Sequence, residues 1–127
     1  PLRIVKVDEQ KQLVFGWASL IQDSDGQVVD SEGDVIEEAD LEAAVYEFML
    51  MIRDSGARHE GLPTGRLVES LMMTAEKAEA MGIEHDGRVG WWIGVYVEDA
   101  DEFAKVTSKE YSMWSIEGTA IAEEVAT

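Results

Sequence analysis

One long segment with helical periodicity lies among segments that favour β-strands, and this arrangement limits the folds open to the chain. From Ala39 to Asp54 the apolar residues recur at spacings of three and four, which predicts a helix with one buried stripe, formed by Leu41, Ala44, Val45, Phe48, Met51 and Ile52. Asp40 is expected to cap the start of this helix and Gly56 to end it.

The segments before this helix favour a sheet. Leu2–Val7 and Leu13–Ile21 are apolar and β-prone, and the turn expected at Asp8–Lys11 would join them as a hairpin. Residues 23–34 are polar and contain Gly26 and Gly33, so they are expected to form a loop or edge structure.

The second half of the chain is predicted to alternate irregularly between strands and short helices. Strands are expected over the ranges 66–73, 91–97 and 111–122, and helices over 75–81 and 101–108. Thr74 should cap the first short helix and Gly82 should end it, with Ala75, Ala78 and Met81 facing inward. The predicted fold is therefore a single α+β domain over residues 1–127, built on a small, largely antiparallel barrel or curved sheet with two or three flanking helices.

The charge balance excludes two classes of partner. Lys and Arg number 10 against 27 Asp and Glu, for a net charge of -17, which should repel phosphate backbones and anionic lipid. We therefore expect neither direct nucleic-acid binding nor membrane binding. Cysteine is absent, so disulfides, thiolate metal sites and cysteine nucleophiles are excluded. The first eight residues lack the pattern of a signal peptide, which favours an intracellular protein.

The acidic residues do not form a recognised metal motif. No register of the segment that begins at Asp23 supplies the oxygen ligands, glycine and final glutamate of an EF-hand loop. His59-Glu60 is not followed by a second histidine four positions after His59, which excludes a zincin helix. No cofactor is expected, and the remaining alternative is a weak surface calcium site formed by Asp23, Asp25, Asp30 and Asp34.

Only two histidines could serve as a base near neutral pH. His85 lies in a polar turn, Glu84-His85-Asp86-Gly87, and is expected to be a solvated loop residue. His59 lies in a glycine-flanked loop just before a predicted strand, where a rigid scaffold could hold it at a cleft. Position alone leaves both a functional and a structural interpretation of His59 open.

Ser115 differs from the other serines in its position within a predicted strand. In Met113-Trp114-Ser115-Ile116-Glu117-Gly118, a period of two places Ser115 and Glu117 on the face opposite Trp114 and Ile116. Ser115 would then point to a cleft or simply to solvent. The same alternation should send Trp91 and Trp92 to opposite sides of their strand, as core residues. Met49, Met51, Met72 and Met73 are expected to fill the core.

Six segments occur in an order that resembles a known protein family. They are Phe15-Gly16-Trp17-Ala18-Ser19, Val29-Asp30-Ser31-Glu32-Gly33-Asp34-Val35-Ile36, Arg58-His59-Glu60, Gly65-Arg66-Leu67-Val68-Glu69-Ser70, Gly90-Trp91-Trp92-Ile93-Gly94 and Trp114-Ser115-Ile116-Glu117-Gly118. Together they resemble the XkdF-like serine proteases of tailed phages and prophages. This family is related to the prohead maturation proteases and, more distantly, to the herpesvirus assemblins.

The resemblance implies a catalytic pair, with Ser115 as nucleophile and His59 as general base. An acidic third member is expected in related proteases on a segment beyond the serine, which this chain lacks, so the chain is either truncated at its C-terminus, uses a nearby carboxylate, or works with a dyad. Glu69 is the internal candidate, and Glu123 and Glu124 are the downstream options.

The implied function is that of a head maturation protease. Such an enzyme would cleave phage scaffold and capsid precursor proteins, and its own chain, inside the assembling prohead in the cytoplasm of the bacterial host. The relatives also make a homo-oligomer an open expectation. One alternative is a catalytically inactive relative that binds scaffold or capsid proteins during assembly, and the other is an unrelated acidic interaction domain.

Overall fold

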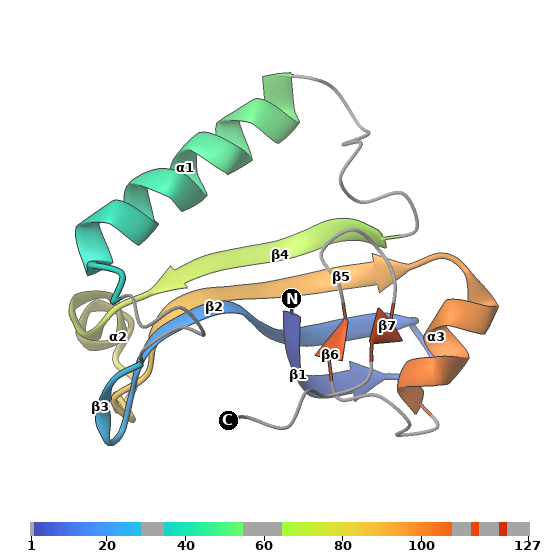
Figure 1. Cartoon of the computed structure of the whole chain (residues 1–127), viewed down its shortest axis with the longest axis horizontal. Helices are drawn as coiled ribbons and strands as arrows, with labels where there is room; N and C mark the ends of the chain where they lie inside the picture. Colours follow the sequence, from blue (N-terminus) through green and yellow to red (C-terminus); the bar gives the residue numbers. More distant parts are fainter. Residues whose placement is uncertain (1, 29–34, 55–64, 108–112, 115–119, 122–127) are drawn as a thin grey trace.

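The computed structural model of the chain describes residues 2–28, 35–54, 65–107, 113–114 and 120–121. Figure 1 shows their arrangement, a curved sheet with α1 lying over one face and α3 at one end. In chain order the elements are β1 (Leu2–Asp8), β2 (Leu13–Asp23), β3 (Gly26–Gln27), α1 (Glu38–Asp54), β4 (Gly65–Met73), α2 (Ala75–Met81), β5 (Val89–Val97), α3 (Ala100–Thr107), β6 (Met113–Trp114) and β7 (Ala120–Ile121). The predicted α+β class is confirmed.

Every strand pair in the described sheet is antiparallel. The order is β4-β5-β2-β1-β6-β7, with β3 paired to β2, and the long strands β2 and β5 form its centre. The sheet is curved and open, which fits the predicted curved sheet. The predicted hairpin of β1 and β2 is confirmed, with Asp8 opposite Leu13.

The prediction of one continuous strand at the end of the chain was wrong. Residues 111–122 were expected to form one strand, but β6 and β7 are separate strands that pair with each other, Met113 with Ile121 and Trp114 with Ala120. The chain direction therefore reverses between Trp114 and Ala120. Strand propensity does not report where a chain reverses, and a single glycine at position 118 is compatible with both a strand and a turn.

One face of the sheet carries the hydrophobic core, and we call it the core face. The odd-numbered residues of β5, from Val89 to Val97, all belong to one buried cluster with Leu41 and Val45 of α1 and Phe103 of α3. Pairing across the strands adds Val14 of β2 and Met72 of β4 to the same cluster. Because side chains alternate between the two faces along a strand, every second side chain of each strand faces a common core.

Helix α1 packs on the core face along only part of its predicted stripe. Leu41 and Val45 are buried, and the Phe48 ring packs edge to face on Trp91, with ring centroids 5.2 Å apart. Ala44 and Met51, which were predicted to be buried, are exposed. The helix begins at Glu38, so Asp40 lies in its first turn and is not the predicted cap. The expected end at Gly56 lies outside the described residues.

Helix α2 confirms both predicted caps. The Thr74 hydroxyl accepts a hydrogen bond from the Lys77 amide at 3.1 Å, and Gly82 ends the helix with a φ of 74°. Ala78 is buried as predicted, but Ala75 and Met81 are exposed. A helix of seven residues presents too short a stripe for three positions to reach the same surface.

Lys77 joins α1, α2 and β4. Its ammonium donates to Glu42 Oε2 at 3.2 Å, to the Tyr46 hydroxyl at 2.7 Å and to the Met72 carbonyl at 2.9 Å. Burial alone would lower the pKa of Lys77, but the hydrogen bonds to Tyr46 and Glu42 outweigh it and the pKa is raised. The ammonium therefore helps to fix the N-terminal half of α1 on the sheet.

The curvature of the sheet begins within β1. A bulge between Ile4 and Lys6 interrupts its pairing with β2, and the backbone of Arg3 passes so close to Gly16 that no side chain fits there. Figure 1 shows β1 bent and the β6–β7 pair turned across the direction of β4 and β5. Helix α3 contacts both β5 and β7, so the two sides of the sheet approach each other through this helix.

Candidate functional site

The two residues predicted to form the catalytic pair, His59 and Ser115, lie outside the described residues. The elements next to them in the chain are described. Residue 65, where β4 begins, follows the segment that contains His59, and β6 ends at Trp114, the residue before Ser115. The geometry of these flanking strands is what the structure contributes to the site.

Strand β4 begins beside the end of β5. Gly65 is buried and pairs with Val97, the last residue of β5, and α3 starts three residues later at Ala100. An exposed ion pair between Arg66 and Glu98, with 3.6 Å between nitrogen and oxygen, lies at the same end. Exposed pairs of this kind contribute little stability, so β-sheet pairing is what fixes the start of β4.

Strand β6 is connected to α3 through its partner strand β7. It pairs with β1 through Trp114 and Leu2, and with β7, which contacts α3. In the strand order β4 and β6 are separated by β5, β2 and β1. In a flat sheet this would place them about 19 Å apart, at about 4.8 Å for each step. The sheet is curved, however, and the strands next to them, β5 and β7, both contact α3 (Figure 1).

Glu69, the internal candidate for a third catalytic member, is exposed on β4. It pairs with Gly94, and the bulge between Leu67 and Glu69 places its side chain on the face opposite the core. It lies four positions after Gly65, which is about 13 Å along an extended strand. The structure therefore describes an accessible carboxylate, and Glu123 and Glu124 lie outside the described residues.

His85 lies in a turn, as predicted, but it is half-buried and not a fully solvated side chain. Its Nε2 lies 2.8 Å from the carbonyl oxygen of Arg88. The neighbouring Asp86 side chain accepts hydrogen bonds from the Arg88 guanidinium, which lower the pKa of that carboxyl. These contacts hold the turn before β5 in shape.

The metal alternative gains no support from the part of the chain that the structure describes, which holds no group of three acidic or histidine side chains placed to bind an ion. Asp23 uses its carboxylate to accept a hydrogen bond from the Asp25 amide at 2.8 Å in the turn before β3. Asp30 and Asp34 lie outside the described residues. Among the described helices, none combines the length and apolar character needed to span a membrane.

The two central tryptophans lie on opposite faces of β5, as alternation predicts. Trp91 is in the core, and its indole N–H donates to the Ser70 hydroxyl at 2.8 Å. Trp92 packs on the other face, edge to face with Trp17 at 5.4 Å between ring centroids and stacked on Phe15 at 6.4 Å. The sequence did not single out Ser70, although a polar residue within a β-prone segment is a usual sign of a buried hydrogen bond.

Nearly the whole chain matches a protein family. The match is to the family described as "Putative phage serine protease XkdF" and extends over residues 2–124. The chain therefore belongs to this family. Comparisons with curated proteins and with solved structures found no match.

Proposed function

We propose that the chain is a serine endopeptidase of phage head maturation, which cleaves scaffold and capsid precursor proteins within the assembling prohead in the bacterial cytoplasm. Family membership supports a serine protease, and the finer role is our inference from the same resemblance. Homo-oligomer formation is part of this proposal. No metal or other cofactor is needed for the chemistry that follows.

In the proposed mechanism Ser115 is the nucleophile and His59 is the general base. The imidazole takes the hydroxyl proton as the serine oxygen attacks the peptide carbonyl, and it then returns a proton to the leaving amine. This requires the imidazole nitrogen and the hydroxyl oxygen to lie within about 3 Å of each other in the reacting complex.

One observation carries the proposal beyond family membership. The strands adjoining the two residues, β4 and β6, both connect to α3, through β5 and through β7 respectively. The proposal requires the chain to run from each strand towards this helix, so that His59 and Ser115 meet. If the sheet were flat, the same residues would have to bridge three intervening strands.

Glu69 is proposed as the third member because it is an accessible carboxylate on the strand that follows His59 in the chain. Its role would be to accept a hydrogen bond from the second imidazole nitrogen and to stabilise the imidazolium. Glu69→Gln should then lower kcat and shift the lower limb of the pH–rate profile. A variant at Glu98, an exposed carboxylate paired with Arg66, is the matched control.

A fluorophosphonate probe tests the nucleophile. We expect covalent labelling of the wild-type chain, identified by peptide mapping at Ser115, and its loss in Ser115→Ala and in His59→Ala. Ser70→Ala should keep the labelling, because this hydroxyl already accepts the hydrogen bond from Trp91. A correctly folded wild-type chain that does not react would instead favour the inactive relative that binds scaffold proteins.

A companion measurement separates a catalytic from a structural role of His59. In a protein that cleaves itself, His59→Ala should abolish the cleavage, and the melting temperature should change little, because a loop histidine contributes little to the core. A large fall in melting temperature would identify His59 as a structural residue.

A further inference from the structure

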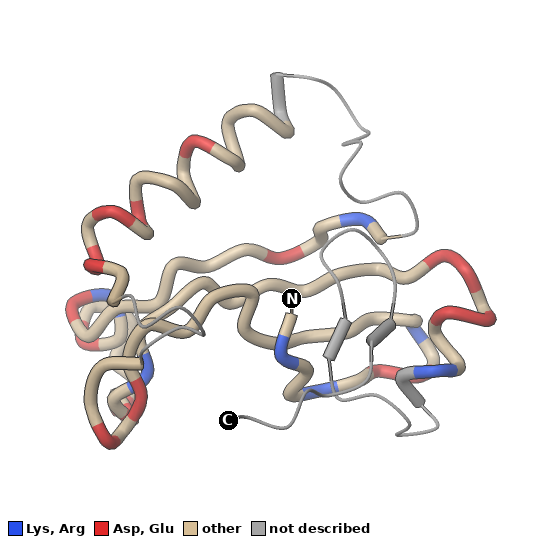
Figure 2. Tube along the Cα trace, viewed as in Figure 1, with Lys and Arg blue, Asp and Glu red and all other residues tan. Residues whose placement is uncertain are grey.

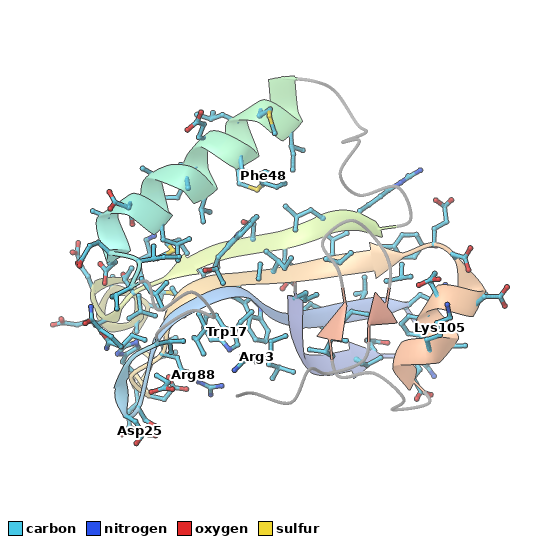
Figure 3. The ribbon with its side chains drawn as sticks, viewed as in Figure 1. Arg3, Trp17, Asp25, Phe48, Arg88 and Lys105 are labelled. Carbon is cyan, nitrogen blue, oxygen red and sulfur yellow. The ribbon has the colours of Figure 1, made fainter. Side chains whose placement is uncertain are left out.

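Helix α1 presents apolar side chains to solvent as well as to the sheet. Leu50 is 62% exposed and Tyr46 is 46% exposed. Two small residues of the same helix, Ala39 and Ala43, are exposed as well. Figure 3 shows Phe48 between α1 and the sheet, where its ring packs on the core face. A helix that packs on one side of a domain usually carries polar residues on its other side, so an apolar outer surface is a specific feature of α1.

These residues form one stripe along the helix, which we call the outer stripe: Ala39, Ala43, Tyr46 and Leu50. Their spacings of four, three and four positions place them on one side of α1, over about three turns. The buried residues Leu41 and Val45 each follow a member of the stripe by two positions, a rotation of about 200°. The outer stripe therefore points away from the core. Single exposed apolar residues are common, but a stripe at helical spacing is the form in which a surface binds another helix.

Acidic side chains border the outer stripe on one flank. Asp40 and Glu47 are exposed, and their separation of seven positions puts them on one line along the helix, beside the stripe. The whole helix is acidic, with one Arg against Glu38, Asp40, Glu42, Glu47 and Asp54. Figure 2 shows acidic residues at several points along α1. A partner that lies along the stripe would therefore meet negative charge on this flank.

The other flank of the stripe is neutralised within the chain. Lys77 donates to Glu42 and to the Tyr46 hydroxyl, and its ammonium lies 5.2 Å from the centre of the Tyr46 ring. These contacts pair the charge of Glu42 and hold the Tyr46 ring in one orientation. An aromatic side chain that is already ordered loses little freedom when a partner packs on it. Basic groups of a partner would be attracted to the flank formed by Asp40 and Glu47.

We propose that the outer stripe binds an amphipathic helix of a partner protein, with Lys or Arg along one edge of its apolar face. Apolar side chains of the partner pack on Tyr46 and Leu50, and its basic side chains lie beside Asp40 and Glu47. Paired helices commonly combine an apolar seam with charged residues along its edges. A second copy of the chain fits less well, because two acidic helices and two net charges of -17 would repel each other. The inference is independent of the proposed protease activity, since it needs neither member of the catalytic pair.

Fluorescence anisotropy with a labelled amphipathic peptide, which has Leu on one helical face and Lys along one edge of it, tests the apolar contact. We expect saturable binding to the full chain that weakens at least about fivefold in Leu50→Gln, because the variant removes an apolar contact without changing the charge. Met81→Gln, at a 56% exposed position on α2, is the matched control and should change the affinity less than about twofold. A scrambled peptide of the same composition should bind weakly.

Charge reversal tests the acidic flank with the same peptide. Glu47→Lys should weaken binding at least about fivefold, because a Lys of the peptide would then face a like charge. Glu9→Lys changes the net charge equally, at an exposed position between β1 and β2, and should change the affinity less than about twofold. Circular dichroism checks that each variant is folded.

Cysteine protection tests where the peptide binds and whether the stripe is accessible in the free chain. The chain has no cysteine, so Ala43→Cys places a single thiol on the outer stripe and Ala80→Cys places one at an exposed position of α2. Both should react with a maleimide at similar rates in the free chain. The peptide at about ten times its Kd should slow labelling of Ala43→Cys about tenfold, because the bound chain is protected, and should leave Ala80→Cys unchanged.

Several results would overturn the proposal. One is the absence of saturable peptide binding, and another is equal binding by the wild-type chain and Leu50→Gln. Equal effects of Glu47→Lys and Glu9→Lys would mean that the peptide responds only to net charge. Slow labelling of Ala43→Cys in the free, folded chain would mean that another part of the chain covers the stripe. Self-association of the wild-type chain that Leu50→Gln abolishes, without peptide binding, would assign the stripe to a second copy.

Discussion

Gly94 lies directly beneath the Phe15 ring. A Cβ atom built at Gly94 would be 2.8 Å from Phe15 Cε1 and 3.2 Å from the Cβ of Glu69, both closer than normal contact. Because Gly94 has no side chain, the Phe15 ring of β2 and the Glu69 side chain of β4 can both lie next to it on β5. The Phe15 ring lies on the face of the sheet opposite the core face, where it is buried.

Gly94→Ala should lower the free energy of unfolding by about 1–3 kcal/mol, because the added methyl group displaces a buried ring. Chemical denaturation measures the change. The double variant Gly94→Ala/Phe15→Leu should recover part of the loss, since leucine can move aside. Additive losses would show that the ring is not the obstacle.

Gly16→Ala should lower the free energy of unfolding more than Gly94→Ala does. The added Cβ would meet the backbone of Arg3, which cannot move without breaking the β1–β2 pairing.

Ser70→Ala should destabilise the chain by about 1–3 kcal/mol, since it leaves the indole N–H of Trp91 buried without an acceptor. Urea denaturation, followed by tryptophan fluorescence, measures the loss. Ser24→Ala in the exposed turn before β3 is the control and should stay within about 0.5 kcal/mol of wild type. Equal effects of the two substitutions would contradict a structural role for the Ser70 hydroxyl.

Lys77→Met should lower the free energy of unfolding by about 1–2 kcal/mol near neutral pH, because it removes the hydrogen bonds that tie α1 to α2 and β4. Lys11→Met, at an exposed position, is the control and should have little effect. Loss of α1 docking should also change the environment of Trp91, against which Phe48 packs.

The contribution of Lys77 should depend on pH in a defined direction. Its pKa is raised above the model-compound value of 10.5, so its stabilising effect is fully present below that value and is lost as the pH rises through the folded-state pKa. The difference in stability between wild type and Lys77→Met should therefore shrink in alkaline solution above about pH 10.5. A difference that grows with pH would contradict the assigned direction.

The sequence predicts the positions of the long elements well, because each has a clear local signal. Signals that depend on neighbours within a few residues were sufficient for three features: the stripe from Leu41 to Val45, the cap at Thr74 and the αL glycine at Gly82. Local signals did not predict the exposure of Met51 and Met81, which depends on how far a helix extends past its sheet.

The site was less predictable than the fold. Periodicity treated residues 111–122 as one strand, whereas the pairing of Met113 with Ile121 shows two. The pairing of Arg3 with Trp17 was also not predicted, because it depends on the register of β1 against β2, and local sequence patterns do not specify that register. His59 and Ser115 were candidates from their positions in the sequence, and their catalytic roles, which came from the family resemblance, remain predictions.

The separation of His59 and Ser115 tests the central claim most directly. The chain has no cysteine, so His59→Cys/Ser115→Cys can be joined by a short bismaleimide without background reaction. We expect efficient intramolecular cross-linking of this pair. The control pair Ser24→Cys/Ser115→Cys, with one cysteine in the turn before β3, should remain unlinked. If the chain is folded and the cysteines at positions 59 and 115 cross-link no more efficiently than the control pair, the result would contradict the proposed catalytic pair.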